Sequence, residues 1–262
     1  MATGRTINKY SRVYVDGYDM SCDSRSIGPL VCNFEEGVDD PLCQSITGVW
    51  LGNASISPGT LNGMFDNTTD TGILTVLGTP AGDRDVMVPI GIQAIPAEGD
   101  PVFCGRFLQD DFIVAPENTP SMVTVKFGNN ISGSPNINYE VPWGILLHEN
   151  SAETSSNTDT GILNTAAAVS YKGGWMMYQV FAADGTSDMT ATITVQHSDT
   201  NVDGNFAALT GATSGAISCS SPTSGVVATT ANNTTVNKYT RWQIELGTAT
   251  SVTFALAFMR GR

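Results

Sequence analysis

The residues of this sequence that could do chemistry are adjacent pairs of carboxylates. Such pairs occur at Glu35-Glu36, Asp39-Asp40 and Asp110-Asp111, and two carboxylates placed on either side of a glycosidic bond are the machinery of glycoside hydrolysis. Successive side chains diverge, however, so an adjacent pair does not supply that geometry. The pairs therefore indicate a solvated acidic surface and not an active site.

The histidines offer no second route to catalysis, because His148 and His197 are the only two and lie in different halves of the chain. The sequence contains no GxSxG elbow, no GxxxxGK[ST] phosphate loop, no GxGxxG turn between a strand and a helix, and no HExxH zinc motif. It therefore predicts no enzyme, with no catalytic, cofactor-binding or metal-binding residue.

One segment matches the opening of an EF-hand calcium loop. Asp199, Asn201 and Asp203 alternate along the chain before Gly204, but the twelfth position, which should be a bidentate Glu, is Thr210. The flanking sequences ITVQH and NFAAL are typical of a strand and a turn and not of helices. A hairpin or loop with Asn and Gly in unusual backbone conformations is therefore the prediction.

The charge balance excludes several classes of partner. The chain has 25 acidic and 12 basic residues in 262, a net charge of −13, so it lacks the basic surface that general nucleic-acid binding or attachment to an anionic membrane requires. Residues 1–150 carry 18 acidic and 7 basic residues (18 − 7 gives −11), and residues 151–262 carry 7 and 5 (−2). This difference predicts a boundary near residue 150.

The cysteines favour reduced thiols over a disulfide framework. They are an odd number without a CxxC pair, which is typical of a protein made in a cytosol; a bond from Cys22 to Cys32 or Cys43 is left open. We expect no secretory signal and no membrane span, because no long apolar run is present.

Glycine, proline, threonine, serine and asparagine interrupt the sequence at short intervals, which favours strands and turns. Short helices are expected at 41–46 and 69–77, and a long loop around 31–50. On the strand at 122–127, Met122, Thr124 and Lys126 should face one side and the intervening apolar residues the other. Further strands are expected at 11–15, 84–95, 102–115, 175–182, 189–197, 238–246 and 251–259.

The predicted fold class is all-β. Residues 1–150 should form an antiparallel β-sandwich with a short helix and long loops, and residues 166–262 a second, Ig-like antiparallel β-sandwich. The polar segment 151–165 between them is expected to be a linker or loop.

Several segments, taken in order, resemble those of tail tube (major tail) proteins of long non-contractile-tailed bacteriophages. The stretch VYVDGYDMS at 13–21 is similar to that family's DGxDLS-like turn, with Met20 where leucine is usual. The segments ISPGTLNGMFD at 56–66, GDPVF at 99–103 and KYTRW at 238–242 followed by the strand at 247–261 match later parts of the pattern. The resemblance covers about residues 10–261 and depends on the order of the segments.

This resemblance implies a virion protein of the phage tail, made in the host bacterial cytoplasm, whose hexameric rings stack into a tube. Its partners would be further copies of itself, the tape measure protein, the tail terminator and distal tail proteins. Genomic DNA would pass through the lumen without specific binding, and no cofactor or membrane is implied. If the acidic residues of 1–150 line that lumen, like-charge repulsion would keep DNA from adhering to the wall.

The alternative is a virion-surface decoration or an adhesion module that binds carbohydrate or a receptor. Trp175, Tyr239 and Trp242 would then form an exposed stacking platform. All three residues lie in strand-like alternating patterns, in which aromatic side chains are usually buried. Burial in a core is therefore the competing expectation for these side chains.

Overall fold

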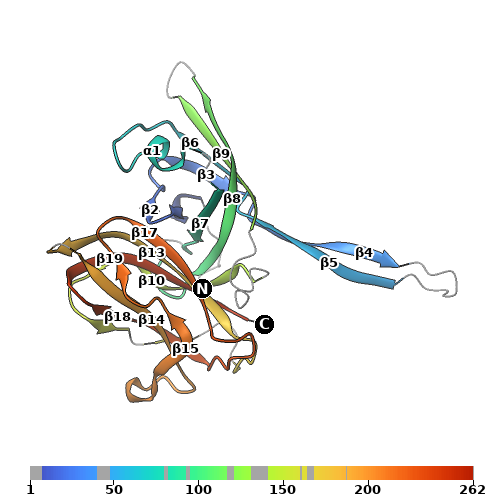
Figure 1. The fold of residues 1–262 in the computed structure, drawn as a ribbon. Coiled ribbons are helices and arrows are strands. Elements are labelled where there is room, and N and C mark those ends of the chain that lie inside the picture. The colour runs from blue at the N-terminus through green and yellow to red at the C-terminus, as the bar shows by residue number, and fades with distance from the viewer. Residues whose placement is uncertain are drawn as a thin grey trace.

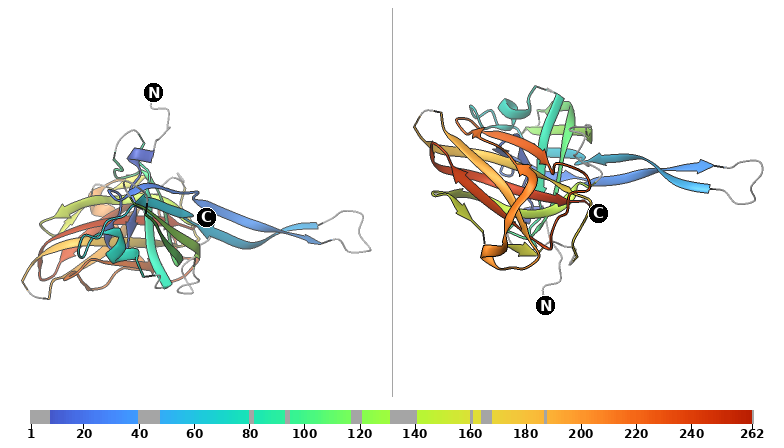
Figure 2. Two further views of the ribbon diagram at one scale, coloured as in Figure 1. Left: turned by 90° about the horizontal axis from the view of Figure 1, so that it is seen from above. Right: turned by 60° about the horizontal axis from the view of Figure 1, so that its bottom comes forward.

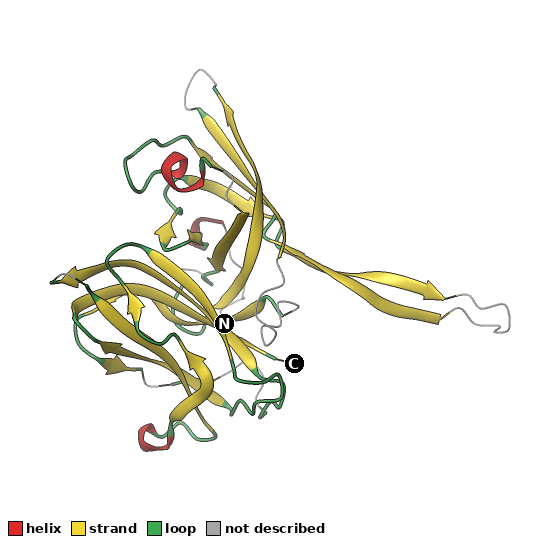
Figure 3. Cartoon of the chain, viewed as in Figure 1, coloured by secondary structure: helices red, strands yellow, loops and turns green. Residues whose placement is uncertain are grey.

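The structure is a computed structural model (Figure 1). It describes residues 8–39, 48–79, 82–92, 95–116, 121–130, 141–159, 161–163, 168–186 and 188–261. Strands dominate these ranges, as Figure 3 shows, with one short α-helix and two 3-10 turns, η1 (Asn8–Tyr10) and η2 (Asp203–Asn205). The all-β prediction is confirmed. No helix in the described ranges is long and apolar enough to span a membrane.

The largest sheet joins strands from both halves of the chain, and all its pairings are antiparallel. Its order is β17 (Thr223–Ala228), β13 (Gly174–Gly185), β19 (Ala249–Arg260), β10 (Trp143–Glu153), β8 (Pro101–Ala115), β7 (Gly82–Pro89), β1 (Tyr14–Val15) and β2 (Tyr18–Asp19). The long strand β8 pairs with β7 along its first part and with β9 (Met122–Asn130) along its C-terminal part. From β9 the sheet continues through β6 (Thr60–Met64) to β3 (Ser24–Gly28).

A second antiparallel sheet contains β11 (Asn157–Thr158), β18 (Tyr239–Leu246), β14 (Thr190–Ser198) and β15 (Ala207–Thr213), with β12 (Ile162–Leu163) and β16 (Ile217–Ser218) at its margins. Its inner residues, such as Ile193 and Ile244, share one buried cluster with Val180 and Leu256 of the large sheet. The two sheets therefore form a sandwich, and the four strands expected from 175 onwards are confirmed.

The predicted division into 1–150, 151–165 and 166–262 stays a prediction. The segment expected to be a linker contains the end of β10 and the short strands β11 and β12. The sandwich core also includes Ile145 and Leu147 from β10, which precede residue 150.

The core of the first half lies under β7, β8, β9 and the helix α1 (Ile73–Leu77). The helix expected at 69–77 is confirmed in shortened form, with Gly72 at its N-cap. The two predicted faces of β9 are also confirmed: Val123, Val125 and Phe127 are buried, and Lys126 on the other face is exposed.

The segment expected to be a long loop is instead a long hairpin, which we call the arm. It consists of β4 (Val31–Asp39) and β5 (Gly48–Ser57), which pair only with each other among the described strands. Figures 1 and 2 show the arm leaving the body of the molecule. The helix expected at 41–46 lies outside the described residues. The prediction of a loop was wrong because a two-stranded ribbon without a partner sheet gives a weak sequence pattern.

Polar contacts hold the base of the arm. The Ser57 hydroxyl donates to Phe127 O over 2.8 Å, and Phe127 N donates to Gly59 O over 3.1 Å. Gly59 has a φ of +71°, and a Cβ there would lie 2.6 Å from the backbone of Gly28. Only glycine fits this turn, which ties the end of the arm to β9.

Buried polar groups join the two halves, and we call this cluster the clasp. Gln179 on β13 is fully buried; its Oε1 accepts from Gly17 N over 2.5 Å, and its Nε2 donates to Asp85 O over 3.0 Å. The Asp85 carboxylate accepts two bonds from Arg106, at 2.7 and 3.0 Å, and a third from the Ser224 hydroxyl at 2.9 Å. Four strands from distant parts of the chain are thereby fixed to one another.

Candidate functional site

Within the ranges that the structure describes, the residues with catalytic potential are not assembled into one site. His148 is buried on β10 and stacks on Phe254 with ring centres 3.9 Å apart, whereas His197 lies on β14 of the other sheet and accepts a bond from Asn237 N. Asp110 forms an ion pair with Lys126 at 3.5 Å. The acidic residues Glu35, Glu36 and Asp39 belong to β4, and Asp40 lies outside the described residues.

The calcium-like segment is held by protein groups. Asp203 forms an ion pair with Arg241, whose guanidinium lies 4.2 Å from the ring centre of Phe206. Asn205 donates to the Thr200 hydroxyl over 2.8 Å. Within the described residues, no three His, Cys, Asp or Glu side chains are grouped so that they could hold a metal ion.

The described thiols of Cys22, Cys104 and Cys219 are free, and Cys43 lies outside the described residues. Burial raises the pKa of the Cys104 thiol and of the Cys219 thiol. Both groups therefore stay protonated and behave as small apolar side chains.

Two of the three aromatic residues of the alternative interpretation are buried. Trp175 is 1% exposed and Trp242 is 4% exposed, and Tyr239 is half-buried. The Trp242 ring meets His148 edge to face at 4.5 Å, and its Nε1 donates to Glu98 Oε1 over 3.0 Å. These three residues therefore form no exposed stacking platform.

Glu98 gives a testable pH dependence. Partial desolvation of its carboxyl and the neighbouring carboxylates of Asp159 and Glu149 raise its pKa from 4.5 to about 7, although the bond from Trp242 acts in the opposite direction. Because the folded-state pKa is above the unfolded value, the stabilisation is complete below about pH 4.5 and is lost as the pH rises through about 7. We expect Glu98→Gln to flatten the dependence of Tm on pH between 5 and 8.

Solvent screening limits this effect to about 1 kcal/mol, since Glu98 is an exposed residue. Thermal melts of both proteins across that pH range would measure it. Glu245→Gln, at an exposed carboxylate of β18, is the matched control and should leave the pH slope unchanged. An unaltered slope in Glu98→Gln would show that Glu98 does not titrate in this range.

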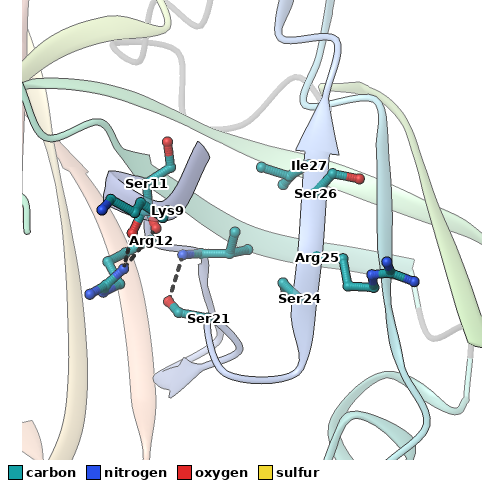
Figure 4. A pocket seen from close by; sticks show the side chains of 9 residues that line it. Lys9, Ser11, Arg12, Ser21, Ser24, Arg25, Ser26 and Ile27 are labelled. Atoms are coloured by element: carbon teal, nitrogen blue, oxygen red, sulfur yellow. Dashed lines mark hydrogen bonds between the residues drawn. The ribbon is translucent and has the colours of Figure 1, made fainter. Parts of the chain in front are cut away.

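The surface features that remain are the arm and a groove at the start of the chain. The groove is a cavity of about 300 Å³ between residues 9–21 and β3 (Figure 4). Lys9 and Arg12 lie on one side of it and β3 on the other, and its walls are completed by Ser11, Val13, Ser21, Ser24, Ser26 and Ile27. Arg25 also lies on β3, but its side chain extends away from Arg12, and its Nη1 donates to Met122 Sδ over 3.7 Å.

Hydrogen bonds shape one wall of the groove. The Ser21 hydroxyl accepts from Val13 N over 3.0 Å, and Arg12 Nη1 donates to the carbonyl oxygens of Lys9 and Ser11, each over 3.1 Å. Sequence reasoning missed this groove. The only available signal was local: four of the chain's twelve basic residues fall within the first 25 positions of an acidic protein.

No family model and no curated protein matches the chain. Among solved structures, it is similar to the crystal structure of the Dit protein of phage SPP1, whose description calls it a paradigm of the hub adsorption apparatus in phages that infect Gram-positive bacteria. The identity is 12%, the alignment covers 95% of this chain and 99% of Dit, and the TM-score is 0.33. Function is therefore argued from the chain's own residues.

Proposed function

We propose that this chain is a structural protein of a phage tail whose hexameric rings stack into the tail tube, with an acidic channel for DNA ejection. The order along the sequence of the segments that resemble tail tube proteins supports this proposal. An all-β fold with an arm that extends from the body of the molecule supports it as well. The tape measure protein, tail terminator and distal tail proteins are the further partners proposed.

The arm is the observation that carries the proposal. Ten residues of β5 extend over about 30 Å, and an isolated two-stranded hairpin is at best marginally stable in water. The sequence of the arm includes Phe34, Val38, Trp50 and Leu51, apolar residue types that gain stability when a neighbour covers them. A second copy that receives the arm makes a head-to-tail contact, and such contacts generate rings or filaments.

The outer face of the sheet β3–β6–β9–β8 supports a role as the channel wall. Across three strands the Thr124 hydroxyl donates to Asn62 Oδ1 over 3.2 Å, and Asn62 Nδ2 donates to the Ser26 hydroxyl over 3.4 Å. Because these polar groups bond to one another, they offer few donors to a passing phosphate, and Lys126 on the same face of β9 is paired with Asp110. We propose that this face, together with the acidic excess of residues 1–150, keeps DNA from adhering to the wall.

Negative-stain microscopy of the purified chain tests the proposal. Stacked rings with a central hole are the expected result. Isolated rings that never stack would contradict the tube and favour a ring-forming hub of the tail. Dispersed monomers that bind glycans would contradict both and favour the decoration or adhesion alternative.

A further inference from the structure

We propose that His148 is a proton-dependent switch at the corner where the chain crosses from the large sheet to the second sheet. This corner runs from the end of β10 to β11. With a proton on each ring nitrogen, His148 holds Glu153 and keeps the corner closed; with a proton on one nitrogen only, it releases Glu153. The switch lies within a single copy of the chain, so it does not depend on the proposed function.

The contacts of one ring nitrogen determine where its proton lies. His148 is 1% exposed, and its ring is stacked on that of Phe254. Its Nδ1 lies 3.0 Å from the backbone oxygen of Phe254. Because a carbonyl oxygen can only accept a hydrogen bond, Nδ1 carries a proton in both charge states of the ring. The proton that comes and goes is therefore the one on Nε2.

The Nε2 atom has two partners of different chemistry. Glu153 Oε1 lies 3.3 Å from it, and Ser151 Oγ lies 3.5 Å from it. An ionised carboxylate only accepts, so the contact with Glu153 needs a proton on Nε2 and makes the ring an imidazolium. The Ser151 hydroxyl can donate, so it suits the neutral ring, in which Nε2 is an acceptor. The same nitrogen thus has a partner in place for each charge state.

The charges around the corner favour the imidazolium and offset the effect of burial. Trp242 of β18 meets the His148 ring edge to face, and its Nε1 donates to the Glu98 carboxyl. Arg241 alternates with Trp242 along β18 and extends to the other face of the second sheet, where it pairs with Asp203. The carboxyl groups at the corner are those of Glu98, Glu149, Glu153 and Asp159.

Glu153 connects the ring to the second sheet. Its Oε2 accepts from Asn157 Nδ2 over 3.3 Å, and Asn157 is the first residue of β11, which pairs with β18. The ladder between β10 and β19 is irregular between His148 and Ser151, so the ring lies at a break in the pairing. A neutral ring leaves the half-buried Glu153 carboxylate without its cationic partner. That carboxylate then turns to water and releases Asn157, which loosens the corner.

The direction of the pH dependence follows from these contacts. Imidazole is the side chain whose charge changes between pH 5 and 8. The ion pair between His148 and Glu153 exists only when Nε2 is protonated. The corner is therefore closed at the acidic end of this range and loosens as the pH rises.

Nitrogen-15 NMR of the histidine rings tests the protonation step in the full chain. The shifts of Nδ1 and Nε2 report which nitrogen carries a proton, and His197→Gln assigns the signals of the two rings. We expect the Nε2 shift of His148 to change between pH 5 and 8 while Nδ1 stays protonated. Glu153→Gln should move this change at least one pH unit lower. Shifts that do not change across this range would overturn the switch.

Hydrogen exchange of the full chain tests whether the corner moves. After correction for intrinsic rates, amides of residues 151–158 should be protected at least tenfold less at pH 8 than at pH 5.5. Glu98→Gln is the control, because it removes the other carboxyl of this region that titrates in the range and should retain the difference. Glu153→Gln should show the lower protection at both pH values. Protection independent of pH in the natural chain, or a full pH difference in Glu153→Gln, would overturn the switch.

Discussion

A chain in which the dipeptide Asn-Gly replaces residues 35–53 is expected to fold as a monomer and to form no tubes. Phe34 and Ala54 lie opposite each other in the arm's ladder, so a two-residue type I′ turn can join them without a change of register. The replacement retains Ile56, which is fully buried, and the Ser57 bond to Phe127. The body therefore keeps its contacts and loses only the part that we propose to dock on a neighbour.

Light scattering after size-exclusion chromatography and negative-stain microscopy would measure the loss, and a thermal melt would confirm that the shortened chain is folded. Tubes formed by the shortened chain alone would show that the arm is not the polymerising contact.

The second large effect is expected at the clasp, where Gln179→Leu should lower the free energy of unfolding by about 2–5 kcal/mol. The substitution removes two buried hydrogen bonds and leaves Gly17 N and Asp85 O without those partners. Gly17 has a φ of +86°, and a Cβ on it would lie 2.7 Å from Val180 O. The backbone of the β1–β2 turn is packed closely against β13, so Gly17 N and Asp85 O cannot turn to solvent to find new hydrogen-bond partners.

Thermal and chemical denaturation would measure this change. Gln243→Leu is the matched control, because Gln243 accepts a bond from the half-buried side chain of Gln196, which can turn to water; we expect it to cost less than about 1 kcal/mol. Equal destabilisation by the two substitutions would contradict a special role for the clasp in joining the halves.

Much of the fold follows from local pattern. The alternation on β9, β14 and β18 predicts strands with one buried face, because one face of each lies in a core. The runs that became β13 and β19 are more continuously apolar, because both faces of these strands are buried over most of their length. The turn at Asp16-Gly17 is also visible in the sequence, since glycine there permits a positive φ. None of these signals shows that the turn lies against β13, because that contact joins residues more than 160 positions apart.

Neither the arm nor the groove could be predicted from local sequence pattern. The arm has no core of its own to impose alternation on β4 and β5, so its sequence carries no strong strand signal. The groove depends on the pairing of β3 with β6 on one side only, which is a property of the sheet and not of residues 24–28. The acidic pairs at Glu35-Glu36 and Asp39-Asp40 were interpreted as a solvated acidic surface, and that interpretation stays a prediction.

An arm that lies open on a free subunit has a consequence for the timing of assembly. Before any contact forms, each copy carries a net charge of −13, so that two copies repel each other at low ionic strength. Docking must also order the arm, a two-stranded ribbon of marginal stability on its own. The first contact between two copies bears this entropic cost without stabilisation from neighbouring contacts. Growth should therefore show a lag that preformed ends abolish, and free subunits should persist until a template starts the polymer.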